Sequence, residues 1–171
     1  MTAQSNYNEP MLGRIFKNWA QHGCRYYHRD NWHFLRELAQ NARDANASRI
    51  EIRTRVQNGL ELLSFSDNGW GMSFEHARHY LFRLYASSKG SDQHAAGEFG
   101  IGFWTLLRFD PQWVQISSRT TKSRRSAMQG DVSVPHSNKT WCIRIDKSFE
   151  YIEQRPCQLV SPGTQIILAR K

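Results

Sequence analysis

The chain has 171 residues, 39% of them hydrophobic, and a formal net charge of +8. This length fits one domain, or one domain with a short extension, and the composition excludes a fibrous or disordered chain. No apolar run approaches the roughly 18 residues that a membrane-spanning helix needs, and residues 1–10 lack the apolar stretch of a signal peptide. We therefore expect a cytoplasmic protein without membrane contact, whose positive charge favours polyanionic partners.

The first predicted element is a helix between Asp30 and Ala47, preceded by an N-terminal arm or extension over residues 1–29. Apolar residues recur in the helix at three- and four-residue steps, which is the period of a helix with one buried face. Asp30 or Asn31 is the expected cap. The predicted apolar stripe consists of Trp32, Leu35, Leu38, Ala39 and Ala42.

A β-hairpin is predicted next. Residues 50–56 alternate between β-branched and charged side chains, which is the period of a strand. Asn58-Gly59 is a strong signal for a two-residue hairpin turn. The return strand runs from Leu60 to Ser66 and ends in a glycine-rich loop that begins at Asp67.

The remainder of the chain is predicted to hold two further helices and three strands. Ser73 is the expected cap of a helix from Phe74 to Tyr85, and residues 86–100 are small and polar, as in a loop. A third helix is expected from Ile101 to before Pro111. The strands are residues 113–119, 140–146 and 164–168. This order predicts a two-layer α/β sandwich with a mixed, mostly antiparallel sheet and helices on one face.

Four short motifs carry the functional prediction. In the first helix, Glu37, Asn41 and Asp44 stand at i, i+4 and i+7 and therefore share one helix face. Such a row borders the predicted buried stripe, where a wall of an active site would lie. A solvent-exposed polar row gives the same pattern, so this motif alone does not decide between the two.

The second motif is Asp67-Asn68-Gly69-Trp70-Gly71-Met72, directly after a strand. An aspartate at a strand end can accept a hydrogen bond from an exocyclic amine such as that of adenine. Gly69 and Gly71 allow the backbone to approach a flat ring or to adopt positive φ. Asp-Asn-Gly is also a common turn sequence, so this motif is weak by itself.

The third motif spans Gly97 to Phe103 at the start of a helix, where glycines free backbone amides to bind phosphate. No βαβ unit surrounds it, which excludes a dinucleotide-binding fold, and the chain has no Walker motif. The fourth motif is Gly163-Thr164 at the entry to the last strand. Its threonine hydroxyl is positioned to meet the same base edge as Asp67.

Together and in this order, the four motifs resemble the Bergerat-fold (GHKL) ATPases, which include DNA gyrase, the ninety-kilodalton heat-shock chaperone, histidine kinases and MutL. The resemblance covers residues 30–168. The segment from Gly97 to Phe103 looks most like the chaperone, and residues 85–89 resemble the lid of MutL and MORC ATPases. Histidine kinases usually carry histidine where Glu37 stands, so their branch fits less well.

The resemblance implies a role for each motif. Glu37 would be the general base that activates the attacking water. Asn41 would be the magnesium ligand, and Asp44 would hold waters around the nucleotide. Asp67, supported by Thr164, would read the adenine amine. The other implied nucleotide contacts are Gly69, Gly71 and Met72 at the base, Gly97, Gly100, Ile101 and Gly102 at the phosphates, and Ser87, Ser88 and Lys89 in the lid.

The function implied is a magnesium-dependent ATPase in residues 30–171, the N-terminal part of a longer protein and slow when isolated. Binding of ATP or ADP would close a lid and drive homodimerisation within a chaperone-like, DNA-repair-like or defence machine. The alternative is a nucleotide-binding regulatory module with little or no turnover. A protein client is expected; DNA binding is an additional hypothesis that rests on the net charge and on Lys122, Arg124 and Arg125.

Overall fold

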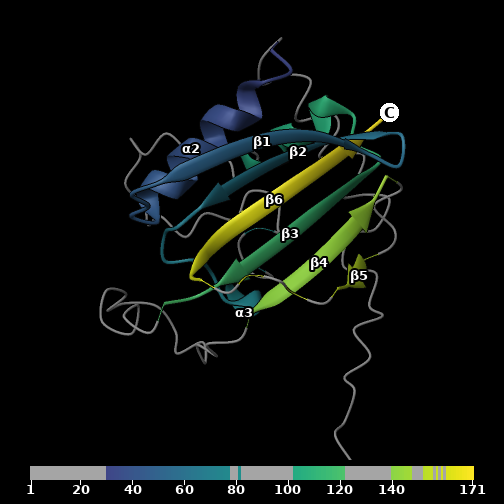
Figure 1. Cartoon of the computed structure of the whole chain (residues 1–171). Coiled ribbons are helices and arrows are strands. Elements are labelled where there is room, and N and C mark those ends of the chain that lie inside the picture. Colours follow the sequence, from purple (N-terminus) through teal and green to yellow (C-terminus); the bar gives the residue numbers. More distant parts are fainter. Residues whose placement is uncertain are drawn as a thin grey trace, which may run out of the picture.

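The computed structural model describes residues 30–77, 81, 102–121, 140–147, 152–155, 157, 159 and 161–171. These residues form a six-stranded sheet in the order β1-β2-β6-β3-β4-β5, with the helices α2 and η2 packed on one face (Figure 1). The described strand pairings are all antiparallel. The predicted two-layer α/β sandwich is therefore confirmed. We call the face toward the helices the inner face and the opposite face the outer face.

Helix α2 spans His33–Asp44, a shorter range than predicted. Asp30 does not cap the helix, because its side chain accepts the N–H of Trp32, which precedes the first helical turn. The buried residues of α2 are Phe34, Leu38 and Ala42. The prediction that Trp32 belongs to the buried stripe is wrong: Trp32 is 49% exposed and covers the edge of Phe109 instead.

The predicted hairpin and its two-residue turn at Asn58-Gly59 are confirmed. β1 (Ile50–Gln57) and β2 (Leu60–Asp67) pair antiparallel, with Gln57 opposite Leu60. Asn58 and Gly59 both have positive φ, 53° and 73°. Two positive φ angles in a two-residue turn define type I′, whose twist matches that of the strands.

The remaining elements agree with the prediction, except that the third helix is a 3₁₀ helix and that the sheet has one strand more than predicted. The second helix, α3, is described over Phe74–His76, and Ser73 caps it as predicted; its expected continuation to Tyr85 falls mostly outside the described residues. The third is a 3₁₀ helix, η2 (Gly102–Phe109). The other strands are β3 (Trp113–Arg119), β4 (Trp141–Asp146), β5 (Ile152–Gln154) and β6 (Gly163–Arg170), of which β5 was not predicted.

The core lies between the inner face and the two helices. Directly opposed residues of antiparallel strands share a face. The pairing therefore aligns Phe65, Ile166, Ile116 and Ile143 in one row, and Leu63, Leu168, Val114 and Ile145 in the next. These rows pack with Phe34 and Leu38 of α2 and with the fully buried Trp104 and Leu106 of η2. Within the described ranges, no helix has the length and apolarity that crossing a membrane requires.

One further inner row ends the sheet. Asp67 lies opposite Thr164, Thr164 opposite Ser118, and Ser118 opposite Trp141. Three of these four side chains are polar, and the row adjoins the apolar rows directly. The sheet therefore presents a polar edge beside its core, at the end where the loop 67–72 begins.

Truncation of the core residue Phe34, which is 1% exposed, tests this packing. We expect Phe34→Ala to lower the free energy of unfolding by about 3–5 kcal/mol, because it leaves a cavity between α2 and the sheet. Arg36→Ala on the exposed side of the same helix should change it by less than about 0.5 kcal/mol. Urea unfolding followed by circular dichroism measures both, and equal losses would contradict this position of the core.

Candidate active site

The loop 67–72 is fixed between three elements. The N–H of Trp70 donates to the carbonyl of Ala45 at the C-terminal end of α2, at 2.9 Å, and the carbonyl of Trp70 accepts the N–H of Thr121 after β3, at 3.0 Å. Asn68 Oδ1 accepts the N–H groups of Ser48 and Arg49. The loop therefore joins the helix layer to the polar edge of the sheet.

Asp67 is a partly buried carboxylate at the start of this loop. Its Oδ1 accepts the N–H of Gly69 at 2.8 Å. Burial raises the pKa of Asp67 above its ordinary value of 3.8, and hydrogen bonds from the backbone of Gly69 and Thr164 offset part of that effect. The buried carboxyl thus favours a partner that donates hydrogen bonds to it.

Two hydroxyls lie beside Asp67 and fix the end of the loop. Ser118 Oγ accepts the N–H of Met72 at 2.9 Å, donates to the carbonyl of Gly163 at 2.9 Å, and lies 3.0 Å from Thr164 Oγ1. Because the single hydroxyl hydrogen of Ser118 is already used, Thr164 donates in their contact and keeps lone pairs to accept with. Trp141 Nε1 donates to the carbonyl of Met72 at 2.8 Å. The structure therefore brings Asp67, Met72 and Thr164 together.

Three glycines permit this close approach of backbones. A Cβ at Gly71, where φ is +64°, would overlap the carbonyl of Arg119, and one at Gly163, where φ is +135°, would overlap the carbonyl of Asp67. A Cβ at Gly69 would lie 2.7 Å from the carbonyl oxygen of Ala45. The glycines of the second motif therefore serve the packing of the loop against β3 and α2.

Glu37 lies at the other end of the site, on α2. Its side chain is 15% exposed, and its Oε1 is 3.2 Å from Nε2 of His33, one turn earlier. Its Oε2 faces the Cα of Gly102, so closely that a Cβ there would overlap it. The structure thus places the first motif against the last glycine of the third motif, with a carboxylate at the start of η2.

Asn41 and Asp44 continue along α2 and are exposed. Asp44 Oδ1 is 3.8 Å from Nε of Arg43. The helix rises 1.5 Å per residue, so Glu37 and Ala45 are separated by about 12 Å along the axis. α2 therefore connects the carboxylate beside Gly102 with the loop of Asp67, and Asn41 lies between them.

Six predicted nucleotide contacts fall outside the described residues: Ser87, Ser88, Lys89, Gly97, Gly100 and Ile101. The basic residues of the DNA hypothesis, Lys122, Arg124 and Arg125, do so as well. Two described residues were missed by the sequence analysis. The i, i+4 spacing of His33 and Glu37 on a predicted helix was an available signal, whereas Ser118 is identified only by the pairing of β3 with β6.

A sandwich of this kind, with a helix carboxylate beside a glycine turn and a partly buried aspartate beside a threonine, is typical of a nucleotide-binding ATPase domain. A family model described as histidine kinase-, DNA gyrase B- and HSP90-like ATPase matches residues 30–164. The chain belongs to this family, which confirms the resemblance seen in its motifs.

The chain is also similar to bacterial chaperones. It is 27% identical over 165 residues to the chaperone protein HtpG of Legionella pneumophila strain Paris, covering 81% of this chain and 24% of that protein. The identity to HtpG of Methylococcus capsulatus is 29% over 101 residues, covering 43% of this chain and 16% of that protein. The chain therefore spans about a quarter, or less, of the length of these relatives.

Two glycines with positive φ form a matched pair that tests the loop. Gly59→Ala has open space around its Cβ and should cost about 1–2 kcal/mol of stability from backbone strain alone. Gly71→Ala carries the same strain and an overlap with Arg119, so it should cost at least about 1 kcal/mol more and displace the loop. Urea unfolding measures the difference, and a shifted amide resonance of Thr121 reports the displacement. Equal losses of stability in the two variants would show that Gly71 does not pack closely against the backbone of Arg119.

The raised pKa of Asp67 has a consequence for stability. Between its unfolded and folded pKa values the native state binds more protons, so this carboxyl lowers stability as pH rises through that window, from just below 4 upward. Asp67→Asn removes the ionisation and keeps an acceptor for the N–H of Gly69. We expect Asp67→Asn to gain stability relative to the parent as pH rises from 3 to 7. Urea midpoints at matched pH test this, and a midpoint of Asp67→Asn that falls relative to the parent as pH rises would contradict it.

Proposed function

We propose that residues 30–171 form an ATP-binding domain that hydrolyses ATP with Glu37 as the general base. The observation that carries this proposal is the contact of the Glu37 carboxylate with Gly102 at the start of η2. A carboxylate beside a glycine turn at a helix start is suited to activate a water next to a bound phosphate. Gly97, Gly100 and Ile101 are proposed to supply further amides to the phosphates.

The orientation of Glu37 supports this role. His33 contacts Oε1, which restricts the side-chain rotation of Glu37 and leaves Oε2 on the side of Gly102. His33 is therefore proposed as a positioning residue for the base. A general base must lie within hydrogen-bond reach of the proton that it removes, so a fixed carboxylate is favourable.

The base of the nucleotide is proposed to lie against the loop 67–72. Asp67 would accept from the adenine amine, with the Thr164 hydroxyl beside it. Gly69, Gly71 and Met72 are proposed to line the pocket, with Met72 held by Ser118 and Trp141. The Asp67 carboxylate already accepts the N–H of Gly69 at Oδ1. Because a carboxylate only accepts hydrogen bonds, it would favour a base whose edge carries a hydrogen-bond donor.

Magnesium is proposed to accompany the phosphates. The described residues contain no group of three His, Cys, Asp or Glu side chains able to hold a metal ion. A nucleotide-bound magnesium ion needs only one or two protein oxygens, and the exposed amide of Asn41 fits that requirement. When bound, the ion would neutralise phosphate charge. Asp44 is proposed to hold waters on the same helix face.

The similarity to HtpG proteins, which are named as chaperones, favours a chaperone-like machine as the context of the domain. We propose that ATP closes a lid over the nucleotide, with contacts from Ser87, Ser88 and Lys89, and promotes homodimerisation. Turnover by the isolated domain is proposed to be slow, because the catalytic site would be complete only in the closed, dimeric state. A protein client and DNA binding remain part of the proposal.

Replacement of Glu37 tests the activity. Glu37→Gln should keep ATP affinity within about threefold and lower the hydrolysis rate by about 10²–10⁴-fold, the usual contribution of a general base. Glu61→Gln is the matched control, because Glu61 pairs with Arg170 and does not contact the site. Calorimetry measures binding, and phosphate release measures turnover.

Three outcomes separate the readings of this experiment. A Glu37→Gln variant that hydrolyses ATP like the parent shows that Glu37 is not the base. A parent chain that binds ATP without phosphate release, also within the longer protein, favours a regulatory nucleotide-binding module. A parent chain that binds no ATP refutes the proposed function.

A further inference from the structure

Strand β1 is exposed along its whole length. All eight of its residues are exposed, including Ile50 at 41%, Ile52 at 50% and Val56 at 75%. In the described sheet β1 is an outermost strand, paired with β2 on one side only. Among the described strands its other side has no partner, and backbone groups there can pair with a further strand.

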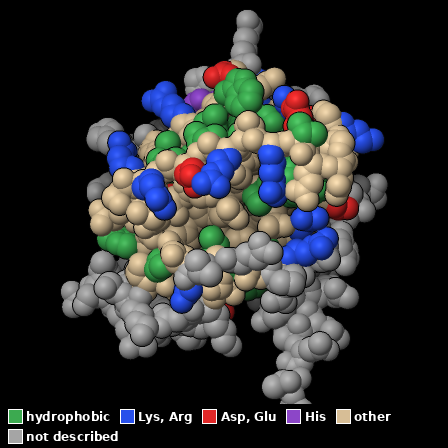
Figure 2. All heavy atoms as spheres, in the orientation of Figure 1, with side chains coloured by type: hydrophobic (Ala, Val, Ile, Leu, Met, Phe, Trp, Pro, Cys, Tyr) green, Lys and Arg blue, Asp and Glu red, His purple; other side chains and the backbone are tan. Residues whose placement is uncertain are grey.

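The two faces of β1 differ in chemistry. Ile52 lies opposite Phe65, and Thr54 lies opposite Leu63, so the β-branched residues of β1 extend the inner apolar rows. Ile52 is 50% exposed while Phe65 is 3% exposed, so the apolar row continues beyond the part that the helices cover. The outer face of β1 carries Glu51, Arg53 and Arg55, and Figure 2 shows basic side chains spread over this outer face with fewer acidic ones.

Edge strands are normally protected from pairing by charged side chains. In β1 the charges occupy the outer face alone, and they include both signs. A partner strand would have to supply apolar residues on the inner face, an acid opposite Arg55 and a base opposite Glu51. The sequence of β1 read in the reverse direction meets all of these requirements.

We propose that β1 pairs antiparallel with β1 of a second copy of this chain, about a two-fold axis at Arg53. This register places Ile50 opposite Val56, Glu51 opposite Arg55 and Ile52 opposite Thr54, each pair twice by symmetry. The two sheets then form one continuous sheet, with the inner apolar rows in line. The proposal does not depend on nucleotide binding.

Charge complementarity selects this partner and this register. Within the described residues, Arg55 has no ion pair, so the Glu51 of a second copy would supply its carboxylate. A slip by one residue places apolar side chains against charged ones. A slip by two residues in one direction replaces the Glu51–Arg55 pairs with two Arg53–Arg55 pairs. The slip in the other direction forms two Glu51–Arg53 pairs but also two Arg49–Arg55 pairs. Either slip therefore has two repulsive pairs, whereas the proposed register has one, Arg53 opposite Arg53.

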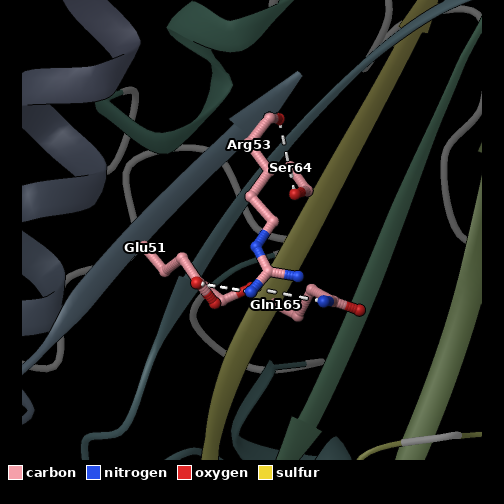
Figure 3. Close-up of polar contacts among 5 residues, drawn as sticks. Glu51, Arg53, Ser64 and Gln165 are labelled. Carbon is pink, nitrogen blue, oxygen red and sulfur yellow. Dashed lines mark hydrogen bonds and ion pairs between the residues drawn. The ribbon is translucent and has the colours of Figure 1, made fainter. Parts of the chain in front are cut away.

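The arginines at the two-fold axis do not oppose this arrangement. Arg53 is held by Glu51 of its own strand, with 2.6 Å between Nη2 and Oε1. In Figure 3 its side chain runs back across β2 toward Gln165 of β6, away from the free edge. Each Arg53 therefore lies over its own sheet. Glu51 contacts this arginine and retains oxygen lone pairs for the Arg55 of the partner copy.

Charge reversal tests the proposal without nucleotide. Sedimentation equilibrium of the 171-residue chain should show a monomer–dimer equilibrium. Glu51→Arg and Arg55→Glu should each weaken dimerisation at least about tenfold, because two attractive pairs become repulsive. The double variant, which restores opposite charges, should regain affinity, and an equimolar mixture of the two single variants should form a heterodimer. Arg43→Glu, on α2 and 78% exposed at its side chain, is the control and should have no effect.

The outcomes that would overturn the proposal are distinct. A parent chain that stays monomeric at all concentrations refutes the pairing of β1 with a second copy of this chain. A dimer that all the charge variants leave unchanged uses another surface. Failure of both the double variant and the mixture to associate, with circular dichroism showing that the variants are folded, excludes the Glu51–Arg55 pairing.

Discussion

The pairing of β2, β6 and β3 is the constraint on which the rest of the site depends. It brings Asp67, Thr164 and Ser118 into one row at the end of the sheet, although they come from distant parts of the chain. Because side chains alternate between faces, a slip of one residue in β2 would turn Asp67 to the outer face and Phe65 out of the core. The hydrophobic core and the position of the carboxylate are therefore set by the same register.

Helix α2 serves the core and the site at once. Phe34, Leu38 and Ala42 pack against the sheet, while Glu37 lies toward η2 and Ala45 contacts the loop of Asp67. A helix of this amphipathic kind is stabilised mainly by the burial of its apolar face. The distance between Glu37 and the loop of Asp67 is consequently fixed by core packing. A substitution in the core that shifts α2 would therefore also shift Glu37.

The sheet has a second consequence at its other edge. β1 takes its register from β2 and thereby carries the inner apolar pattern one strand beyond the helices. The chain spans about a quarter of the length of its chaperone relatives. The proposed pairing of β1 would enlarge the sheet without altering the proposed nucleotide site, whose residue Asp67 lies in the inner row at the end of the sheet.

The sequence by itself determined the local features and the family. Asn58-Gly59 predicted the hairpin turn, and Ser73 predicted a cap, because these signals lie within a few consecutive residues. The four motifs identified the ATPase fold for the same reason. Only the tertiary structure decided that Trp32 is exposed and that Ser118 holds Met72 and Thr164, a contact between residues 46 positions apart in the chain. Strand register and helix packing set such contacts, and no local pattern in the sequence encodes them.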